Sequence, residues 1–114
     1  MKVKLAEGMK DNFLTPNKEY IVLAIEIQES EFSFISYRIL PDKGCPILVA
    51  SDQMIISCSK LSSTWRIKQE SLDYYTLQPE KWSRDGFWED YYNDDPKAVQ
   101  NFKIEKEKIF AEEG

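Results

Sequence analysis

The sequence predicts a mainly β domain that ends in helices. We expect a small antiparallel barrel, or a strongly bent sheet, of five to six strands with a short helix and a C-terminal helix packed on it. Apolar residues recur at strand period from residue 20 to residue 77, turn residues separate the segments about every ten residues, and the period becomes helical after residue 85. The length indicates a single domain over 1–114, strand-rich over 13–82 and helical over 85–112.

The first predicted strands carry alternating apolar residues. Alternation in EYIVLAIEIQ puts the larger aliphatic residues on one face: Ile21, Leu23, Ile25 and Ile27. Val22 and Ala24 lie on the other face, which is expected to be exposed to solvent further along, at Glu26 and Gln28. In FSFISYRIL the apolar phase changes after Phe34, which predicts a bulge or a strong bend there.

Four more short strands follow a predicted turn. In LPDKG, Pro41 presets the first central turn position and Gly44 can adopt a positive φ, so a hairpin with a G1-type bulge is expected. The segments PILVA, MIISC, TWRIK and DYYTL then have strand-like composition and are separated by polar turns.

The last third of the chain has helical period. Residues 85–96, DGFWEDYYNDDP, hold five carboxylates, four aromatic rings and no basic residue. At about 100° per residue the rings cluster on one side of a short helix and most acids on the other. Asp95 and Pro96 are suited to cap and begin a second helix. Its expected apolar stripe includes Lys106 and leaves out Ile104, and its apolar members are Ala98, Val99, Phe102, Ile109 and Phe110.

Several functional classes are disfavoured by composition. The chain has no histidine, which removes the commonest general base and most catalytic zinc sites, and its four glycines form no phosphate-binding motif. Cys45 and Cys58 lack CxxC spacing and are expected to be buried free thiols. The net charge of −5 argues against direct nucleic-acid binding and favours a basic protein partner. We therefore expect no cofactor, no metal and no enzymatic activity.

No apolar run is long enough to span a membrane, and the N-terminal residues lack the apolar core of an export signal, so a cytoplasmic protein is expected.

Two features leave alternatives open. The pairs Glu89-Asp90 and Asp94-Asp95 could chelate a cation or act as acid and base. Adjacent helical residues diverge by about 100°, however, and no calcium-loop spacing is present, so a solvated acidic face is the simpler interpretation.

Four aromatic residues in strand-like positions either fill the core or line a shallow peptide-binding groove: Trp65, Tyr74, Tyr75 and Trp82.

The order of several segments resembles a known group of proteins. LTPNKEYIVLAIE, YRILPDKGCPILVASDQM, STWRI and PEKWSRDGFWEDYYNDDPKAV together are similar to the small immunity proteins that bacteria encode beside polymorphic toxins, including those of contact-dependent growth inhibition systems. LTPNKEY also resembles the LTxGKxY start of SH3-like barrels, with Asn17 where glycine is usual. Asparagine tolerates positive φ best after glycine, so the turn can be kept.

This resemblance implies a monomeric, non-enzymatic inhibitor that binds a toxin domain, commonly a nuclease, in a 1:1 complex. Such families share no positional motif, so the site is predicted from chemistry: carboxylates suit a basic nuclease cleft, and half-buried rings anchor an interface. The main predicted surface is Asp85, Trp88, Glu89, Asp90, Tyr92, Asp94 and Asp95. A second acidic group, on the same side or the opposite one, is Glu26, Glu29 and Glu31. The alternative function is an SH3-like module or regulatory subunit that recognises a peptide or protein.

Overall fold

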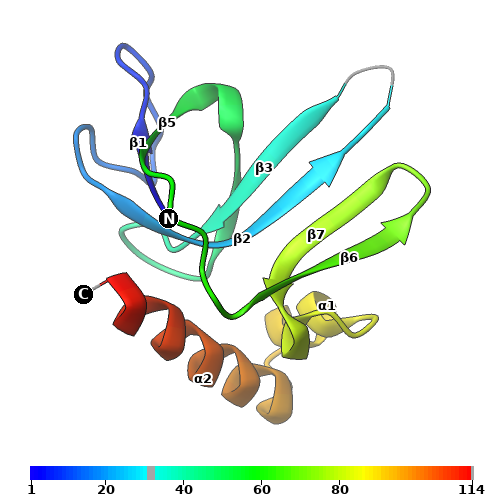
Figure 1. Ribbon diagram of the computed structural model, residues 1–114. Helices are drawn as coiled ribbons and strands as arrows, with labels where there is room; N and C mark the ends of the chain where they lie inside the picture. The colour runs from blue at the N-terminus through cyan, green and yellow to red at the C-terminus, as the bar shows by residue number, and fades with distance from the viewer. Residues whose placement is uncertain (31–32, 114) are drawn as a thin grey trace.

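The computed structural model describes residues 1–30 and 33–113 and has a mainly β architecture with a C-terminal helix, which confirms the predicted fold class. The strands are β1 (Lys2–Leu5), β2 (Tyr20–Gln28), β3 (Phe34–Ile39), β4 (Ile47–Ala50), β5 (Met54–Cys58), β6 (Trp65–Ser71) and β7 (Tyr74–Pro79). Two short 3₁₀ helices, η1 (Ser51–Gln53) and η2 (Glu80–Trp82), precede the helices α1 (Phe87–Tyr92) and α2 (Pro96–Glu113). Figure 1 shows both α-helices below the sheet, away from the tips of the long hairpins.

The sheet is open and antiparallel, in the order β4-β3-β2-β1-β5, with β7 and β6 added beside β2. It has seven strands, one more than the largest number predicted, because β1 at the N-terminus was not expected. Strand β2 is the centre of this arrangement. Its first residues pair with β1, its last four pair with β7, and β3 runs along its other edge. One edge of β2 therefore pairs with two separate pairs of strands: β1 with β5 near its start, and β7 with β6 near its end.

A bulge at Leu23 changes which residues of β2 face the helices. Val22 pairs with Ile39 and Ala24 pairs with Arg38, so β2 has one extra residue between these pairs. Extra residues of this kind shift the alternation of side chains by one. The predicted common face of β2 is therefore wrong: Ile21 and Leu23 pack in the helix-side core, whereas Ile25 and Ile27 pack with Val22 on the other side. The bulge predicted after Phe34 is not found, since residues 34–38 of β3 pair with β2 without a register shift.

Two apolar cores lie on opposite faces of β2. One contains Val22 and Ile25 with residues of β1, β3, β4, β5 and β6. The other lies under the helices and contains Leu23, Trp82, Phe87, Phe102 and Ile109. The Trp82 and Phe102 rings are stacked with their centroids 5.3 Å apart. Helix packing in this region therefore depends on the aromatic residues of η2, α1 and α2.

The C-terminal helix begins where the sequence predicts. The carboxylate of Asp95 accepts a hydrogen bond of 3.0 Å from the Ala98 N–H, and Pro96 is the first residue of α2. The buried stripe of α2 is narrower than predicted, because Val99 is 39% exposed and Phe110 is 36% exposed, while Glu105 is buried. No helix in the described part of the chain is both long enough and apolar enough to cross a membrane.

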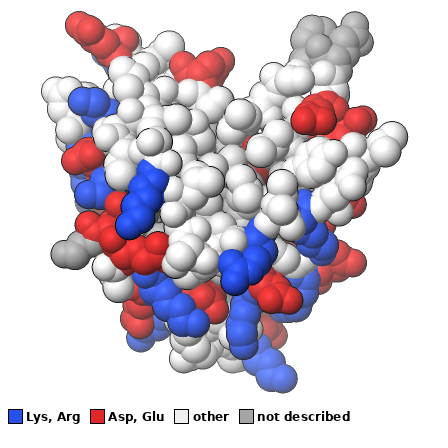
Figure 2. Space-filling model, in the orientation of Figure 1, with Lys and Arg blue, Asp and Glu red and all other residues white. Residues whose placement is uncertain are grey.

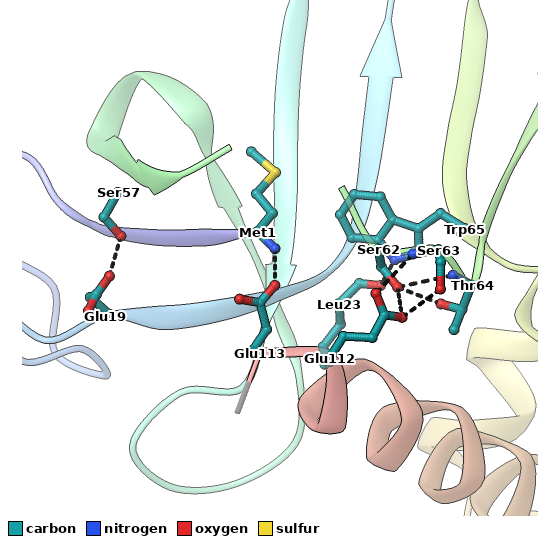
Figure 3. Close-up of polar contacts among 10 residues, drawn as sticks. All are labelled: Met1, Glu19, Leu23, Ser57, Ser62, Ser63, Thr64, Trp65, Glu112 and Glu113. Carbon is teal, nitrogen blue, oxygen red and sulfur yellow. Dashed lines mark hydrogen bonds and ion pairs between the residues drawn. The ribbon is translucent and has the colours of Figure 1, made fainter. Parts of the chain in front are cut away.

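Polar contacts hold the C-terminal end of α2 against the strands (Figure 3). The carboxylate of Glu112 accepts hydrogen bonds from the Ser63 N–H at 3.0 Å and from the Ser62 hydroxyl at 2.9 Å. Glu113 forms an ion pair with the N-terminal ammonium group of Met1. The hydrogen bonds from Ser63 and Ser62 lower the pKa of Glu112 and fix the end of α2 to the loop before β6, and the Glu113 ion pair fixes it to the N-terminus.

The segment LTPNKEY, which resembles the start of SH3-like barrels, forms a hydrogen-bond network with Asp42 of the β3–β4 loop. Asn17 has φ 65°, as its substitution for glycine predicts. The carboxylate of Asp42 accepts hydrogen bonds from Lys18 at 2.6 Å, Thr15 at 2.7 Å and Tyr20 at 2.9 Å. The Lys18 ammonium group, together with the two hydroxyl groups, lowers the pKa of Asp42 to about 2.

The β3–β4 hairpin is confirmed, but its turn differs from the prediction. Residues 40–46 connect Ile39 to its partner Ile47, and the pairing of β3 with β4 continues without a shift, so no G1-type bulge is formed. Gly44 has the expected positive φ of 95°. Both cysteines are free, as expected. Cys45 is exposed in this loop, however, so the prediction that it is buried is wrong.

Replacement of Phe102 by alanine should lower the free energy of unfolding by about 3–4 kcal/mol, because it leaves a cavity between aromatic rings. Urea denaturation measures this loss. Phe110→Ala on the same helix is the control, since Phe110 is 36% exposed whereas Phe102 is 5% exposed. Equal losses for the two variants would contradict the described packing of α2.

Asp42 should make stability depend on pH in the acidic range. Because its pKa is lowered from 3.8 to about 2 in the folded chain, its contribution is fully present above pH 3.8 and is lost as the pH falls through about 2. The difference in urea midpoint between the wild type and Asp42→Asn should therefore shrink below about pH 4. A difference that stays constant down to pH 2 would show that the Asp42 carboxylate is not held by this network.

Candidate functional site

A groove of about 290 Å³ lies between α1 and the helix-side face of β7. Its walls come from segments far apart in the sequence: the end of β2, strand β7, the turn at Asp85 and Gly86, and the first turn of α1. Four carboxylates line this acidic groove: Glu26, Glu70, Asp85 and Glu89. Its aromatic residues are Tyr74, Trp82, Phe87 and Trp88, and its one basic residue is Arg84.

The helical wall of the acidic groove is fixed by buried aromatic packing. Gly86 precedes α1 with φ 79°, a conformation in which a side chain would be strained. Phe87 follows and is buried against Trp82, and Trp88 packs edge-on to Trp82 with ring centroids 5.5 Å apart. This anchoring leaves Glu89 exposed and Asp85 fully exposed beside the groove.

The acidic residues of the groove are only partly neutralised. Lys68 on β6 lies 3.5 Å from Glu70 and 3.8 Å from Asp85, and it donates a hydrogen bond to the Ser83 carbonyl. Arg84, which also lines the groove, forms an ion pair of 2.8 Å with Asp90, a carboxylate outside the groove lining. Glu89 has no ion pair among the described residues. The groove therefore keeps a negative potential at its mouth.

Arg38 links the sheet to α1 beneath this groove. Its guanidinium group lies 3.8 Å from the centre of the Trp88 ring, pairs with Glu26 at 2.9 Å and donates to the Tyr92 hydroxyl at 3.0 Å. Tyr92 in turn donates to the Pro46 carbonyl at 2.6 Å. One nitrogen of Arg38, Nε, is buried without a partner among the described residues. Arg38 thus neutralises Glu26 and sets the orientation of Trp88.

The tyrosines of α1 add no charge near neutral pH. Burial, and beside it the Cys45 thiol, raise the pKa of Tyr91 to about 12. Burial also raises the pKa of Tyr92, against the opposing effect of the Arg38 charge. The charge of this region therefore comes from its carboxylates.

The structure brings together some of the predicted site residues and separates others. Asp85, Trp88 and Glu89 share the acidic groove with Glu26, so the first member of the second acidic group lies on the same side as α1. Asp90 is paired with Arg84, and Tyr92 is bound to Arg38 and Pro46.

Three other predicted residues lie outside the groove. Asp94 is exposed with φ 62°, and Asp95 is the N-cap of α2. Glu29 lies at the tip of β2 in another hollow beside Phe34, and Glu31 falls outside the described residues.

Sequence reasoning missed three residues of this region: Arg38, Glu70 and Gln78. Gln78 is buried and accepts a hydrogen bond from the Trp88 indole at 3.3 Å. A signal existed for Arg38, since a charged residue between Tyr37 and Ile39 interrupts an apolar segment. Of the four strand aromatics, Trp65 and Trp82 are buried in the cores, Tyr74 lines the groove, and Tyr75 lies beside Ile27 on the opposite face of β7.

No three acidic or cysteine side chains converge to hold a metal ion within residues 1–30 and 33–113. The groove carboxylates are spread over the walls of a hollow rather than gathered around one point. This arrangement is suited to binding a cationic surface by several separate contacts.

Arg38→Leu should lower the free energy of unfolding by about 3 kcal/mol, because it leaves the Glu26 carboxylate in a largely buried place without its partner. The control is Arg84→Leu, whose ion pair with Asp90 is about half exposed and should contribute less than about 1 kcal/mol. Chemical denaturation compares the two. Similar losses would contradict the special role of Arg38.

Comparison of the chain with models of known protein families, with curated proteins and with solved structures finds no match.

Proposed function

We propose that this chain is an immunity protein that binds and neutralises a cognate bacterial toxin domain in the cytoplasm. The observation that carries the proposal is the acidic groove, where four carboxylates from two strands and the α1 region lie beside aromatic side chains and are only partly neutralised by Arg38 and Lys68. The resemblance of the sequence to small immunity proteins supports the same function. In this proposal the partner is a nuclease domain with a basic active-site cleft, bound 1:1 without enzymatic chemistry.

Carboxylates are suited to this task because a nuclease cleft is built to hold phosphates. Asp85 and Glu89 present negative charge on exposed side chains and can occupy the positions of phosphate groups in such a cleft. The net charge of −5 adds a longer-range attraction that speeds association with a basic surface. Bound in this way, the chain would exclude the nucleic-acid substrate by occupying its place.

The groove also offers a way to anchor the partner. A lysine or arginine side chain that enters it can contact a carboxylate with its charged end and the Tyr74 or Trp88 ring with its stem. Arg38 shows this kind of packing within the chain, since its guanidinium group stacks on Trp88 and pairs with Glu26. Contacts of this type are common among interface residues that contribute most to affinity.

The alternative, a peptide-binding SH3-like module, has weaker support from the groove. Recognition of proline-rich peptides uses aromatic faces that are open to the ligand. Trp82 is almost fully buried and Trp88 is covered on one face by Arg38. The groove therefore offers a peptide more charge than aromatic surface.

The proposed function requires that a toxin domain be encoded beside this gene, and this neighbouring toxin domain is the partner used in the test. Co-expression of the chain should restore growth of cells that produce the toxin domain, and the two proteins should co-purify in equal amounts. If the wild-type chain neither forms this complex nor restores growth, the proposed function is wrong.

The double variant Asp85→Lys/Glu89→Lys should slow association with the toxin domain about tenfold or more at low salt, since it reverses the charge at the groove mouth. The wild-type association rate should fall as ionic strength rises. Stopped-flow or surface-based kinetics measure both effects.

The matched control is Glu7→Lys/Glu107→Lys, which makes the same change in net charge at two exposed positions away from the groove. Its association rate should fall much less. If the two double variants slow association equally, net charge rather than the groove guides binding.

A further inference from the structure

The outer half of the sheet has an apolar face on the side away from the helices. The bulge at Leu23 turns Ile25 and Ile27 to this side, and the strand pairing continues the pattern across the neighbouring strands. Ile25 pairs with Tyr37 and with Leu77, which pairs with Ile67. Ile27 pairs with Ile35 and Tyr75. The apolar sheet face defined in this way is Ile27, Ile35, Ile67, Tyr75 and Leu77.

Charged residues of the same strands lie on the opposite, helix-side face. Glu26 pairs across the strands with Ser36 and Thr76, and Thr76 pairs with Lys68, so this row alternates with the apolar one. Figure 2 shows an extensive uncharged surface in the middle of the view, between charged groups at its margins. An antiparallel sheet usually turns its polar face to solvent, and here an apolar face is open instead.

Two isoleucines of this face are exposed to solvent. Ile67 is 68% exposed and Ile35 is 39% exposed, although both continue rows that begin in the buried core. Within the described part of the chain, both α-helices pack against the other side of the sheet. Contiguous apolar surface of this kind is typical of protein interaction sites.

We propose that the apolar sheet face is a second docking surface for the basic partner of the proposed function, on which this inference rests. The part of the partner that it fits has an apolar centre and lysine or arginine residues at one margin. Because the acidic groove and this face lie on opposite sides of β7, a partner that uses both surfaces extends around the free edge of β6.

The charges at the margin of the face select this partner over a second copy of the chain. Glu29 and Asp73 lie at the tips of the two hairpins, where the Glu29 N–H donates to the Asp73 carbonyl at 2.7 Å. Both are exposed, and each lies two residues from an apolar-face residue, Ile27 or Tyr75. In a symmetric dimer over this face, acidic margins and two net charges of −5 would be brought together. A basic margin complements these charges.

The experiment measures the affinity of the neighbouring toxin domain for Ile67→Ser and Ile67→Lys variants by calorimetry. Loss of the Ile67 side chain, which the partner would bury, should weaken binding about tenfold or more. The lysine variant should bind more weakly still, because it places a positive charge against a basic partner. Leu61→Ser and Leu61→Lys are the controls, since Leu61 is 54% exposed in a loop outside the face. Ile67 is exposed enough that thermal unfolding should remain near that of the wild type.

The outcomes separate this inference from the proposed function. If the wild type binds and the Asp85→Lys/Glu89→Lys variant is weakened while both Ile67 variants bind normally, the apolar sheet face is not a docking surface and the function stands. If the wild type does not bind the toxin domain, both are overturned. Sedimentation of the chain alone completes the experiment by comparing the wild type with Ile67→Lys. If the wild type is a dimer and the Ile67→Lys variant is a monomer, the face binds a second copy of the chain and this proposal is overturned.

Discussion

The bulge at Leu23 is the constraint on which the rest of this structure depends. A regular β2 would keep its isoleucines and leucines on one face, and the sheet would then have a single apolar side. With one extra residue, β2 contributes Leu23 to the core beneath the helices and Ile25 to the core on the opposite face. It also turns Glu26 toward α1, where it meets Arg38 and lines the acidic groove.

Aromatic packing converts this strand geometry into the walls of the acidic groove. Trp82 and Phe87 fix the start of α1 against β2, so the exposed carboxylates of the helix are held at a defined distance from β7. Arg38 adds a polar contact that links β2, β3 and α1 at one point. Preorganised surfaces lose less conformational entropy on binding, which favours tight association with one partner.

Local chemistry predicts the ends of elements well and their pairing less well. Asp95 with Pro96, and Asn17 at positive φ, follow from the conformational preferences of those residues alone. The faces of β2 could not be read from its alternation, because the bulge depends on how β2 pairs with β3, which is a long-range property. Strand β1 had a signal, since Lys2 and Lys4 alternate with Val3 and Leu5, but four residues are too few to distinguish a strand from a turn. The site was found in part: the acids of α1 were evident, whereas Glu70 joins them only through the β6–β7 hairpin.

The central claim is that the acidic groove is the surface that receives a basic partner. Chemical-shift mapping of the isotope-labelled chain during titration with the neighbouring toxin domain tests it most directly, since every backbone amide reports separately. The account predicts the largest changes at residues 85–89 and at Tyr74 and Thr76 of β7. Saturable binding with these amides unchanged, and with changes gathered elsewhere on the chain, would contradict it.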